Sequence, residues 1–508
     1  MPRTNTRALH IADNLETLAT LPDESVGLIY LDPPFNSGRS YDLVARNRAT
    51  DDGGRTPAFA DTFTWTAETE RTFGTLGSDV PRDVAEAVTT LARPLGRRDL
   101  GAYLVMMAPR LVEMRRVLAA DGSLYLHCDA SASHYLKVLL DAVFGPGNFR
   151  NEIVWKRTHA HSSSRRFGPV HDTILFYSKT RSYRWNQGYT AYPASYLDRY
   201  YTHQDDRGRY QLITCTAPGD RDGTRAHYEW HGKWPPPGRH WAWKREQMEA
   251  FEREGRLAHS ANGIPRLKRY TDDAPGVQLQ DIWTDINRLD AHSDERVGYE
   301  TQKPLDLLER IILASSDPGD IVLDPFAGSG TTVVMAERLN RGWIGIDTSI
   351  LAGSITLARV RREVDAKRVA LEGFPESRSA ALRLLRDEPV AFGLWGTSMM
   401  ATLADRDGQH PLVVTGSGRL RVKNRAVDLL SWVPLGNTKA NAVPKMPRGR
   451  LSKIGFVLRT KRRDGDLRTA LQSRIDVPVF GVEIDDLVNA DSRRRGLAGC
   501  VVQAAASA

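Results

Sequence analysis

The chain has 508 residues, 41% of them hydrophobic and 26% charged, and a formal net charge of +8. No apolar run approaches the roughly 18 residues that a membrane-spanning helix needs, and the amino terminus lacks the apolar core of a signal peptide. The three cysteines, Cys128, Cys215 and Cys500, lie far apart, which argues against a disulfide scaffold or a thiolate metal site. We therefore expect a cytoplasmic protein of several domains, without a metal ion or a membrane contact, whose basic charge permits binding to a polyanion.

An acidic, proline-rich segment follows the first buried strand that the sequence predicts. The apolar run Val26–Leu31 is typical of such a strand, and Asp32, Pro33, Pro34 and Phe35 come directly after it. The prolines fix φ and remove two backbone donors, which leaves carbonyl acceptors beside a carboxylate, while Phe35 supplies a flat face. This ledge suits a planar ring with an exocyclic amino group. We therefore interpret all four residues as catalytic residues that act at such a nitrogen.

A second pattern, almost three hundred residues later, predicts a cofactor site. Ile321–Asp324 and Trp343–Asp347 are typical of strands, and between them lie a small-residue turn, Pro325–Gly330, and a helical pattern, Thr331–Leu339. In this layout the glycines let the backbone approach a ligand, and the second acid, Asp347, can bind ribose hydroxyls or merely cap a helix. An acid ahead of the turn disfavours pyrophosphate. It suits a cationic ligand that carries an amino acid, such as S-adenosyl-L-methionine.

Together, LDPPFNSG and the distant LDPFAGSGTT resemble the amino-methyltransferases of DNA, and their order resembles the β group of that family. Stretches that begin at Asp13, Tyr125 and Thr301 agree, and the resemblance covers roughly residues 8 to 360. It implies a doubly wound, Rossmann-like α/β methyltransferase sheet, S-adenosyl-L-methionine as methyl donor and double-stranded DNA as substrate. The implied cofactor-binding residues are Asp324, Pro325, Phe326, Gly328, Ser329, Gly330, Thr331, Asp347, Lys303 and Pro304.

Several of these residues also have a plain structural interpretation. Lys303 could be a solvated lysine ahead of a helix, and Asp13 with Asn14 could simply cap one. His127 and Cys128, at the end of a predicted strand, are more typical of a core than of a ligand site.

Strand–helix alternation predicts a core in two parts, residues 1–180 with the catalytic half and 299–360 with the cofactor-binding half. Residues 181–298 lack sustained periodicity and predict an inserted domain. The region 151–300 holds seven of the 11 tryptophans and 11 of the 16 tyrosines, interleaved with basic residues such as Arg207, Arg209 and Lys268. This mixture suits phosphate contacts and base stacking, and the family places its target-recognition region here; the alternative is a small aromatic core with a solvated basic face. Residues 361–508 predict a small α/β accessory domain without a nuclease pattern.

In the family, an Asp at the first position of the ledge accompanies adenine N6, and a Ser accompanies cytosine N4, so Asp32 favours adenine. We expect a site-specific adenine-N6 DNA methyltransferase that flips its target base out of the helix and transfers the methyl group directly. A cytosine-N4 methyltransferase and a non-catalytic DNA-binding subunit with a vestigial core are the alternatives. A homodimer and a separate restriction endonuclease or defence-system chain are possible partnerships.

Overall fold

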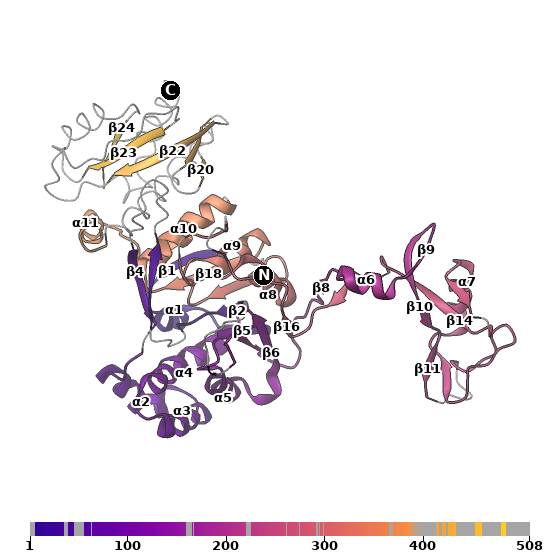
Figure 1. Ribbon diagram of the computed structural model, residues 1–508. Coiled ribbons are helices and arrows are strands. Elements are labelled where there is room, and N and C mark those ends of the chain that lie inside the picture. The colour runs from indigo at the N-terminus through magenta and orange to yellow at the C-terminus, as the bar shows by residue number, and fades with distance from the viewer. Residues whose placement is uncertain are drawn as a thin grey trace. The chain divides into compact units, whose positions relative to one another are not determined.

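The computed structural model in Figure 1 describes residues 6–34, 63–158, 165, 167–219, 225–260, 262–273, 275–290, 293, 295–297, 299–364, 369–388, 391 and 395. It describes the backbone of residues 39–44 and 55–61 and of five strands between residues 413 and 483. The chain forms two compact units, one made of residues 187–280 and the other of the chain on either side.

A nine-stranded sheet lies at the centre of the larger unit. Across the sheet the strands are β16 (Ile282–Trp283), β6 (Phe149–Lys156), β7 (His171–Ser178), β5 (Leu118–Cys128), β2 (Val26–Leu31), β17 (Ile321–Asp324), β18 (Gly342–Asp347), β1 (Arg7–Ile11) and β19 (Ala370–Glu372). All neighbours are parallel except at β7, which is antiparallel to β5 and to β6. The sequence predicts a parallel sheet that Ile153–Trp155 and Thr173–Tyr177 complete as edge strands. The sheet is instead mixed, and neither strand is outermost, because β7 lies between β6 and β5 and β16 pairs with the outer side of β6.

Helices cover both faces of this sheet (Figure 1). Alternate residues of β2 enter the two cores, Leu28 and Tyr30 on one side and Ile29 and Leu31 on the other. That alternation is why a continuous apolar run forms a strand buried on both faces. The doubly wound α/β fold is therefore confirmed. The face of Ile29 carries α1 (Asn14–Thr20), α2 (Ala67–Asp79), α3 (Arg82–Leu95), α4 (Asp99–Val117) and α5 (Ser133–Phe144), and the face of Leu28 carries α8 (Leu305–Ser315), α9 (Thr331–Arg338) and α10 (Ile350–Val364).

The connections between strands reverse direction at the middle of the sheet. From β17 the chain passes through α9 to β18 on one side, whereas from β2 it passes through α2, α3 and α4 to β5 on the other. In open α/β sheets of this kind, ligands bind outside the carboxyl ends of the strands at the point of reversal. That point lies between β17 and β2.

The smaller unit is built around a four-stranded antiparallel sheet and two two-stranded ribbons. Its elements are β8 (Tyr189–Thr190), α6 (Ala194–Tyr200), β9 (His203–Asp205), β10 (Gly208–Thr214), β11 (Thr216–Pro218), β12 (Arg239–Trp241), α7 (Arg245–Arg253), β13 (Leu257–His259), β14 (Pro265–Tyr270) and β15 (Val277–Gln278). Its core contains Cys215, Trp230, Trp241 and Met248. The expected insertion, 181–298, is longer than this unit at both ends, because residues 181–186 and β16 belong to the larger unit.

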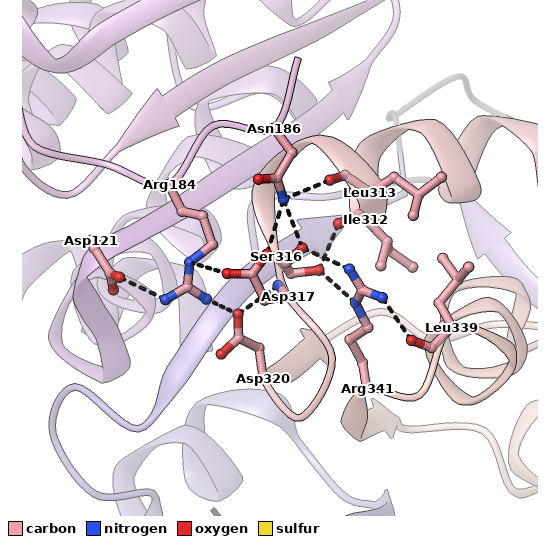
Figure 2. A network of polar contacts seen from close by, with 10 residues as sticks. All are labelled: Asp121, Arg184, Asn186, Ile312, Leu313, Ser316, Asp317, Asp320, Leu339 and Arg341. Carbon is pink, nitrogen blue, oxygen red and sulfur yellow. Dashed lines mark hydrogen bonds and ion pairs between the residues drawn. The ribbon is translucent and has the colours of Figure 1, made fainter. Parts of the chain in front are cut away.

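Both chain segments that lead to the smaller unit are fixed to α8 within the larger one. Before the unit, the Asn186 backbone N–H donates to Ala314 O (2.7 Å), and its side chain donates to Leu313 O and Ser316 O, both at 3.1 Å. Figure 2 shows this cluster, in which Arg184 pairs with Asp121, Asp317 and Asp320, and Arg341 donates to Ser316 and Leu339. After the unit, Asp285 pairs with Arg310 of α8. The donors of Asn186 and Arg341 satisfy carbonyl groups that would be orphaned at the carboxyl end of a helix.

Beyond the expected core boundary at residue 360, the chain still contributes to the sheet. That boundary falls inside α10, and β19 pairs with β1 at the sheet edge. A helix, α11 (Arg378–Asp387), follows. The five strands of the tail, β20 (Val413–Thr415), β21 (Arg419–Val422), β22 (Arg425–Trp432), β23 (Lys453–Arg459) and β24 (Val479–Glu483), form one sheet, and β3 (Arg39–Val44) pairs with β4 (Arg55–Asp61). Among the described residues, no helix is long and apolar enough to cross a membrane.

Candidate active site

The two predicted motifs meet at one edge of the sheet. β2 and β17 are neighbours, with Leu28 opposite Val322 and Ile29 opposite Leu323. Asp32 follows β2 and Asp324 ends β17, so both carboxylates lie at the carboxyl edge where the connections reverse. Both line a single cavity of about 690 Å³.

Most of the predicted site residues line this cavity. They are Asp32, Pro33, Pro34, Lys303, Pro304, Asp324, Pro325, Phe326, Gly328, Ser329, Thr331 and Asp347. Gly330 belongs to the same turn as the N-cap residue of α9. Phe35, the predicted stacking face, lies outside the described residues.

The two carboxylate oxygens of Asp32 have different surroundings. Lys303 Nζ donates to Asp32 Oδ2. Asp32 Oδ1 is buried and has no hydrogen-bond partner among the described residues. One oxygen is therefore held by a cation, and the other has no donor in the part of the chain that the structure describes. The sequence predicts a cofactor contact for Lys303, whereas the structure places its ammonium group on the predicted catalytic acid.

Behind Asp32 lies a buried chain of polar groups that the sequence interpretation missed. His127 is fully buried and Asp172 is 1% exposed. His127 Nδ1 lies 2.9 Å from the Tyr30 hydroxyl and 3.9 Å from Asp32 Oδ1. His127 Nε2 lies 3.2 Å from Asp172 Oδ2, and Arg157 pairs with the other Asp172 oxygen at 3.2 Å. The signals in the sequence were the family-like stretch that begins at Tyr125 and a histidine at the carboxyl end of a predicted strand, which burial alone explains equally well.

The glycine turn after β17 is held from behind by α10. Gly328 and Gly330 have φ of 50° and 76°, a left-handed backbone conformation that favours glycine. The Gly328 N–H donates to Asp347 Oδ2 at 2.8 Å, and Thr356 of α10 donates to Gly328 O at 3.0 Å. Arg359, buried in α10, donates to Ser329 O at 2.9 Å. The sequence identified the turn but not the helix that fixes its shape.

The cavity is lined by three carboxyl groups that affect one another's charge, those of Asp32, Asp324 and Asp347. Burial raises the pKa of Asp324 to about 7, and the nearby carboxylates of Asp32 and Asp347 add to the effect, against the hydrogen bonds that Asp324 accepts. Burial also raises the pKa of Asp347, against hydrogen bonds from backbone N–H groups. Because buried carboxylates gain most from a nearby opposite charge, this wall favours a ligand with positive charge.

Asp13 and Asn14 do more than cap a helix. Asp13 caps α1 by accepting from the Leu15 N–H at 2.8 Å. It also pairs with the largely buried Arg110 (2.6 Å), which in turn donates to Asn14 Oδ1. The Asn14 side chain then donates to Pro325 O at 2.8 Å. This network ties the start of the chain to the turn after β17.

The smaller unit presents both aromatic and basic side chains, but several of the basic ones are already paired. Trp234 and Tyr200 are exposed. Arg207 pairs with Asp273, Arg209 with Asp198, and Lys268 with Asp205. Ion pairs at the surface contribute little to stability, and the Arg207 and Arg209 side chains remain 44% and 41% exposed.

Comparison with known proteins identifies relatives of this chain. The profile of a family described as DNA methylase (N6_N4_Mtase) matches residues 26–352. The Type II methyltransferase M.EcaI of Enterobacter cloacae is 38% identical over 259 residues, which cover 51% of this chain and 57% of M.EcaI. The Type III restriction-modification enzyme StyLTI Mod subunit of Salmonella typhimurium is 28% identical over 364 residues, which cover 67% of this chain and 51% of that subunit. The chain therefore spans little more than half the length of these two relatives.

Solved structures also resemble this chain. The putative DNA modification methylase TTHA0409 of Thermus thermophilus, in complex with S-adenosyl-L-methionine, is 15% identical, with a TM-score of 0.36, and the match covers 73% of this chain and 99% of that chain. The family profile extends from β2 to α10 and includes both motifs that line the cavity. Because it matches more than half of the residues, this chain belongs to the DNA methylase family.

Proposed function

We propose that this chain is a site-specific DNA methyltransferase that uses S-adenosyl-L-methionine to methylate the N6 amino group of adenine. The observation that carries the proposal is that Asp32 and Asp324, from distant segments, line one cavity at the point of reversal of the sheet. That arrangement brings an amine-binding ledge beside a cofactor turn, which a methyl transfer between two ligands requires.

The cavity wall suits the proposed donor. When bound, S-adenosyl-L-methionine supplies an electrophilic methyl group on a positively charged sulfur atom. The raised pKa of Asp324 supports a cationic ligand here. The Gly328 N–H holds Asp347 at the end of β18, which presents that carboxylate for ribose hydroxyls.

Asp32 is the residue that activates the target nitrogen. The amine of a nucleobase is a poor nucleophile because its lone pair is delocalised into the ring. Asp32 Oδ1, which has no donor among the described residues, accepts one amine hydrogen, and the Pro33 carbonyl accepts the other. These bonds pull the nitrogen towards tetrahedral geometry and free the lone pair. Because the target amine is stacked inside duplex DNA, the base must be flipped out, at a cost of a few kcal/mol.

An Asp at position 32, rather than a Ser, favours adenine as the target base, and cytosine N4 is the second candidate. M.EcaI and StyLTI Mod are named as a methyltransferase and as a restriction-modification subunit, which favours double-stranded DNA as substrate and a restriction system, with its endonuclease, as the setting. The exposed aromatic and basic side chains of residues 187–280 supply the surface for target recognition.

The test uses deuterated S-adenosyl-L-methionine and unmethylated genomic DNA, followed by digestion to nucleosides and mass spectrometry. We expect labelled N6-methyladenine with the wild type. Asp32→Ala should abolish transfer while the thermal stabilisation by S-adenosyl-L-methionine persists. Asp79→Ala, at an exposed acid of α2, is the control and should transfer normally.

Each other outcome has a distinct meaning. Labelled N4-methylcytosine would reassign the base. A wild type that neither transfers a methyl group nor is stabilised by S-adenosyl-L-methionine would indicate a vestigial core. Normal transfer by Asp32→Ala would show that Asp32 has another role.

A further inference from the structure

A histidine and an aspartate are buried together directly behind Asp32. His127 and Asp172 are at most 1% exposed and form a pair through Nε2 and Oδ2. Two apolar side chains of similar size would fill this space without the cost of desolvating ionisable groups. The pair therefore needs an explanation beyond packing, and its position suggests one, since His127 Nδ1 lies 3.9 Å from the oxygen of Asp32 that lacks a hydrogen-bond partner among the described residues.

We propose that His127, backed by Asp172, is the final acceptor of the proton that leaves the target amine, and that Asp32 Oδ1 passes this proton to His127 Nδ1. The inference rests on the proposed function and extends it from the amine to the route by which the proton leaves.

The proton count requires such an acceptor. When the nitrogen forms its bond to the methyl carbon, the carbon–sulfur bond breaks and its electron pair stays on sulfur. The nitrogen has then supplied its lone pair and carries one proton too many. That N–H bond breaks, its electrons return to nitrogen, and the proton moves to Asp32 Oδ1 and then to the lone pair of His127 Nδ1. The products are the neutral methylamino base, ionised Asp32 and an imidazolium paired with Asp172.

The surroundings support this direction of transfer. Lys303 occupies Asp32 Oδ2, so a proton that reaches Asp32 goes to Oδ1, the oxygen that faces His127. Burial tends to raise the pKa of Asp172, but the hydrogen bond and charge of His127 and the charges of Arg157 and Lys303 hold it below its usual range. Asp172 therefore stays ionised and stabilises an imidazolium.

The Tyr30 hydroxyl, 2.9 Å from Nδ1, is the group that must give way. Its pKa is raised well above the usual value by burial and by the nearby carboxylates, so it remains a neutral hydroxyl. It can hydrogen-bond to Nδ1 as a donor before the transfer and as an acceptor afterwards. The transfer therefore requires the Tyr30 hydroxyl to turn away from the Nδ1 lone pair while Asp32 Oδ1 closes its 3.9 Å distance to Nδ1.

The ionisable groups that contact His127, or that act on one of its contact partners, come from several elements. They are Tyr30 and Asp32 at the end of β2, Cys128 next to it on β5, Asp172 on β7, Arg157 after β6 and Lys303 ahead of α8. A pH effect must be assigned among them by substitution.

The experiment measures single-turnover methyl transfer to DNA across pH, with S-adenosyl-L-methionine saturating at every pH so that Asp324 does not limit the rate, for the full-length wild type, His127→Asn and Asp172→Asn. Because a histidine accepts a proton only when neutral, the wild-type rate should fall towards low pH. His127→Asn should lose this limb and slow transfer by about 100-fold at neutral pH, the scale of general acid–base catalysis. Asp172→Asn should move the limb to lower pH, because the imidazolium loses its counter-charge. Calorimetry should give unchanged binding of S-adenosyl-L-methionine in both variants.

Tyr125→Phe is the matched control, because Tyr125 is another buried residue of β5 and its hydroxyl contacts Ser315, away from Asp32. It should keep the wild-type pH profile. If His127→Asn does not fold, the relay is tested by the pH profile of Asp172→Asn, together with a solvent deuterium isotope effect on the wild-type rate.

Wild-type pH profiles in both His127→Asn and Asp172→Asn would overturn the relay, whatever happens to their melting temperatures. If the wild type transfers a methyl group but His127→Asn and Asp172→Asn both keep the wild-type pH profile, the proposed function stands and this inference alone fails. If the wild type transfers nothing, both fall.

Discussion

The carboxyl groups of Asp32, Asp324 and Asp347 line one cavity, and burial makes the charge of Asp324 sensitive to what enters it. In the protein without ligand its pKa is about 7, chiefly because of burial. Near neutral pH the protonated and ionised forms of Asp324 are therefore both populated. A cationic ligand favours the ionised form, so ligand binding and proton release are linked.

We predict that the affinity for S-adenosyl-L-methionine rises with pH through neutrality. Below the pKa of the free site, the ligand must displace a proton from Asp324, and from pH 8 to pH 6 this raises the Kd by about tenfold. Titration calorimetry at several pH values, in buffers of different ionisation enthalpy, measures both the Kd and the protons released. Asp324→Asn should bind weakly with no such pH dependence. Equal affinities at pH 6 and pH 8 in the wild type would contradict the linkage.

At this scale the sequence predicted the residues that occur in compact local patterns. Asp32 and Asp324 could be found because each follows an apolar strand and precedes a turn. His127, by contrast, depends on partners from β2 and β7, and Arg359 depends on its contact with a turn 30 residues away. No local pattern distinguishes a buried histidine with two polar partners from one that only fills space.

At the scale of elements, the turn between β17 and α9 depends on α10. Gly330 lies so close to this helix that an added Cβ would be 2.5 Å from Thr356 Cγ2 and 2.6 Å from its Oγ1. Thr356 also holds Gly328 O. A side chain at position 330 would therefore strain the backbone and push away the helix that shapes the turn.

We predict that Gly330→Ala abolishes the thermal stabilisation by S-adenosyl-L-methionine and lowers the melting temperature. Left-handed φ and the clash with Thr356 act together, and their cost is of the order of 1–3 kcal/mol. Gly74→Ala is the control: this helical glycine of α2 has nothing within 4 Å of an added Cβ and should be neutral or stabilising. Differential scanning fluorimetry with and without ligand makes the comparison. A normal ligand response in Gly330→Ala would show that the turn does not form the cofactor site.

The sequence predicts best those helices and strands that have a clear hydrophobic pattern. Val26–Leu31 and Ile321–Asp324 have the bounds that the sequence predicts, because each is a short apolar run that ends at an acid or just before one. The antiparallel direction of β7 and its position inside the sheet were not predictable, because an apolar run does not indicate which strands lie beside it. Likewise, nothing local shows that α10 and β19 belong to the core rather than to the accessory region.

At the scale of the whole molecule, the smaller unit is attached through two neighbouring strands. β8 and β15 pair with Thr190 opposite Val277, so the chain leaves and returns at nearly the same place. The connecting segments are fixed within the larger unit by Asn186 at one end of α8 and by Asp285 through Arg310. The larger unit thus has its own sheet, cores and anchors, and residues 187–280 can be removed between two fixed points.

We predict that replacing residues 187–280 with a short glycine–serine linker retains the stabilisation by S-adenosyl-L-methionine but weakens DNA binding and flattens its salt dependence. The slope of log K against log salt concentration is negative, and each lost phosphate contact reduces its magnitude by about 0.9. In the full-length protein, Trp234→Ala and Tyr200→Ala, at exposed aromatic residues of the smaller unit, should each weaken binding by about 1–3 kcal/mol if they stack on bases. Val138→Ala, at a comparably exposed apolar residue of α5, should have no effect. Fluorescence anisotropy with labelled duplex DNA at several salt concentrations gives both quantities, and an unchanged affinity and slope in the shortened protein would place the DNA surface on the larger unit.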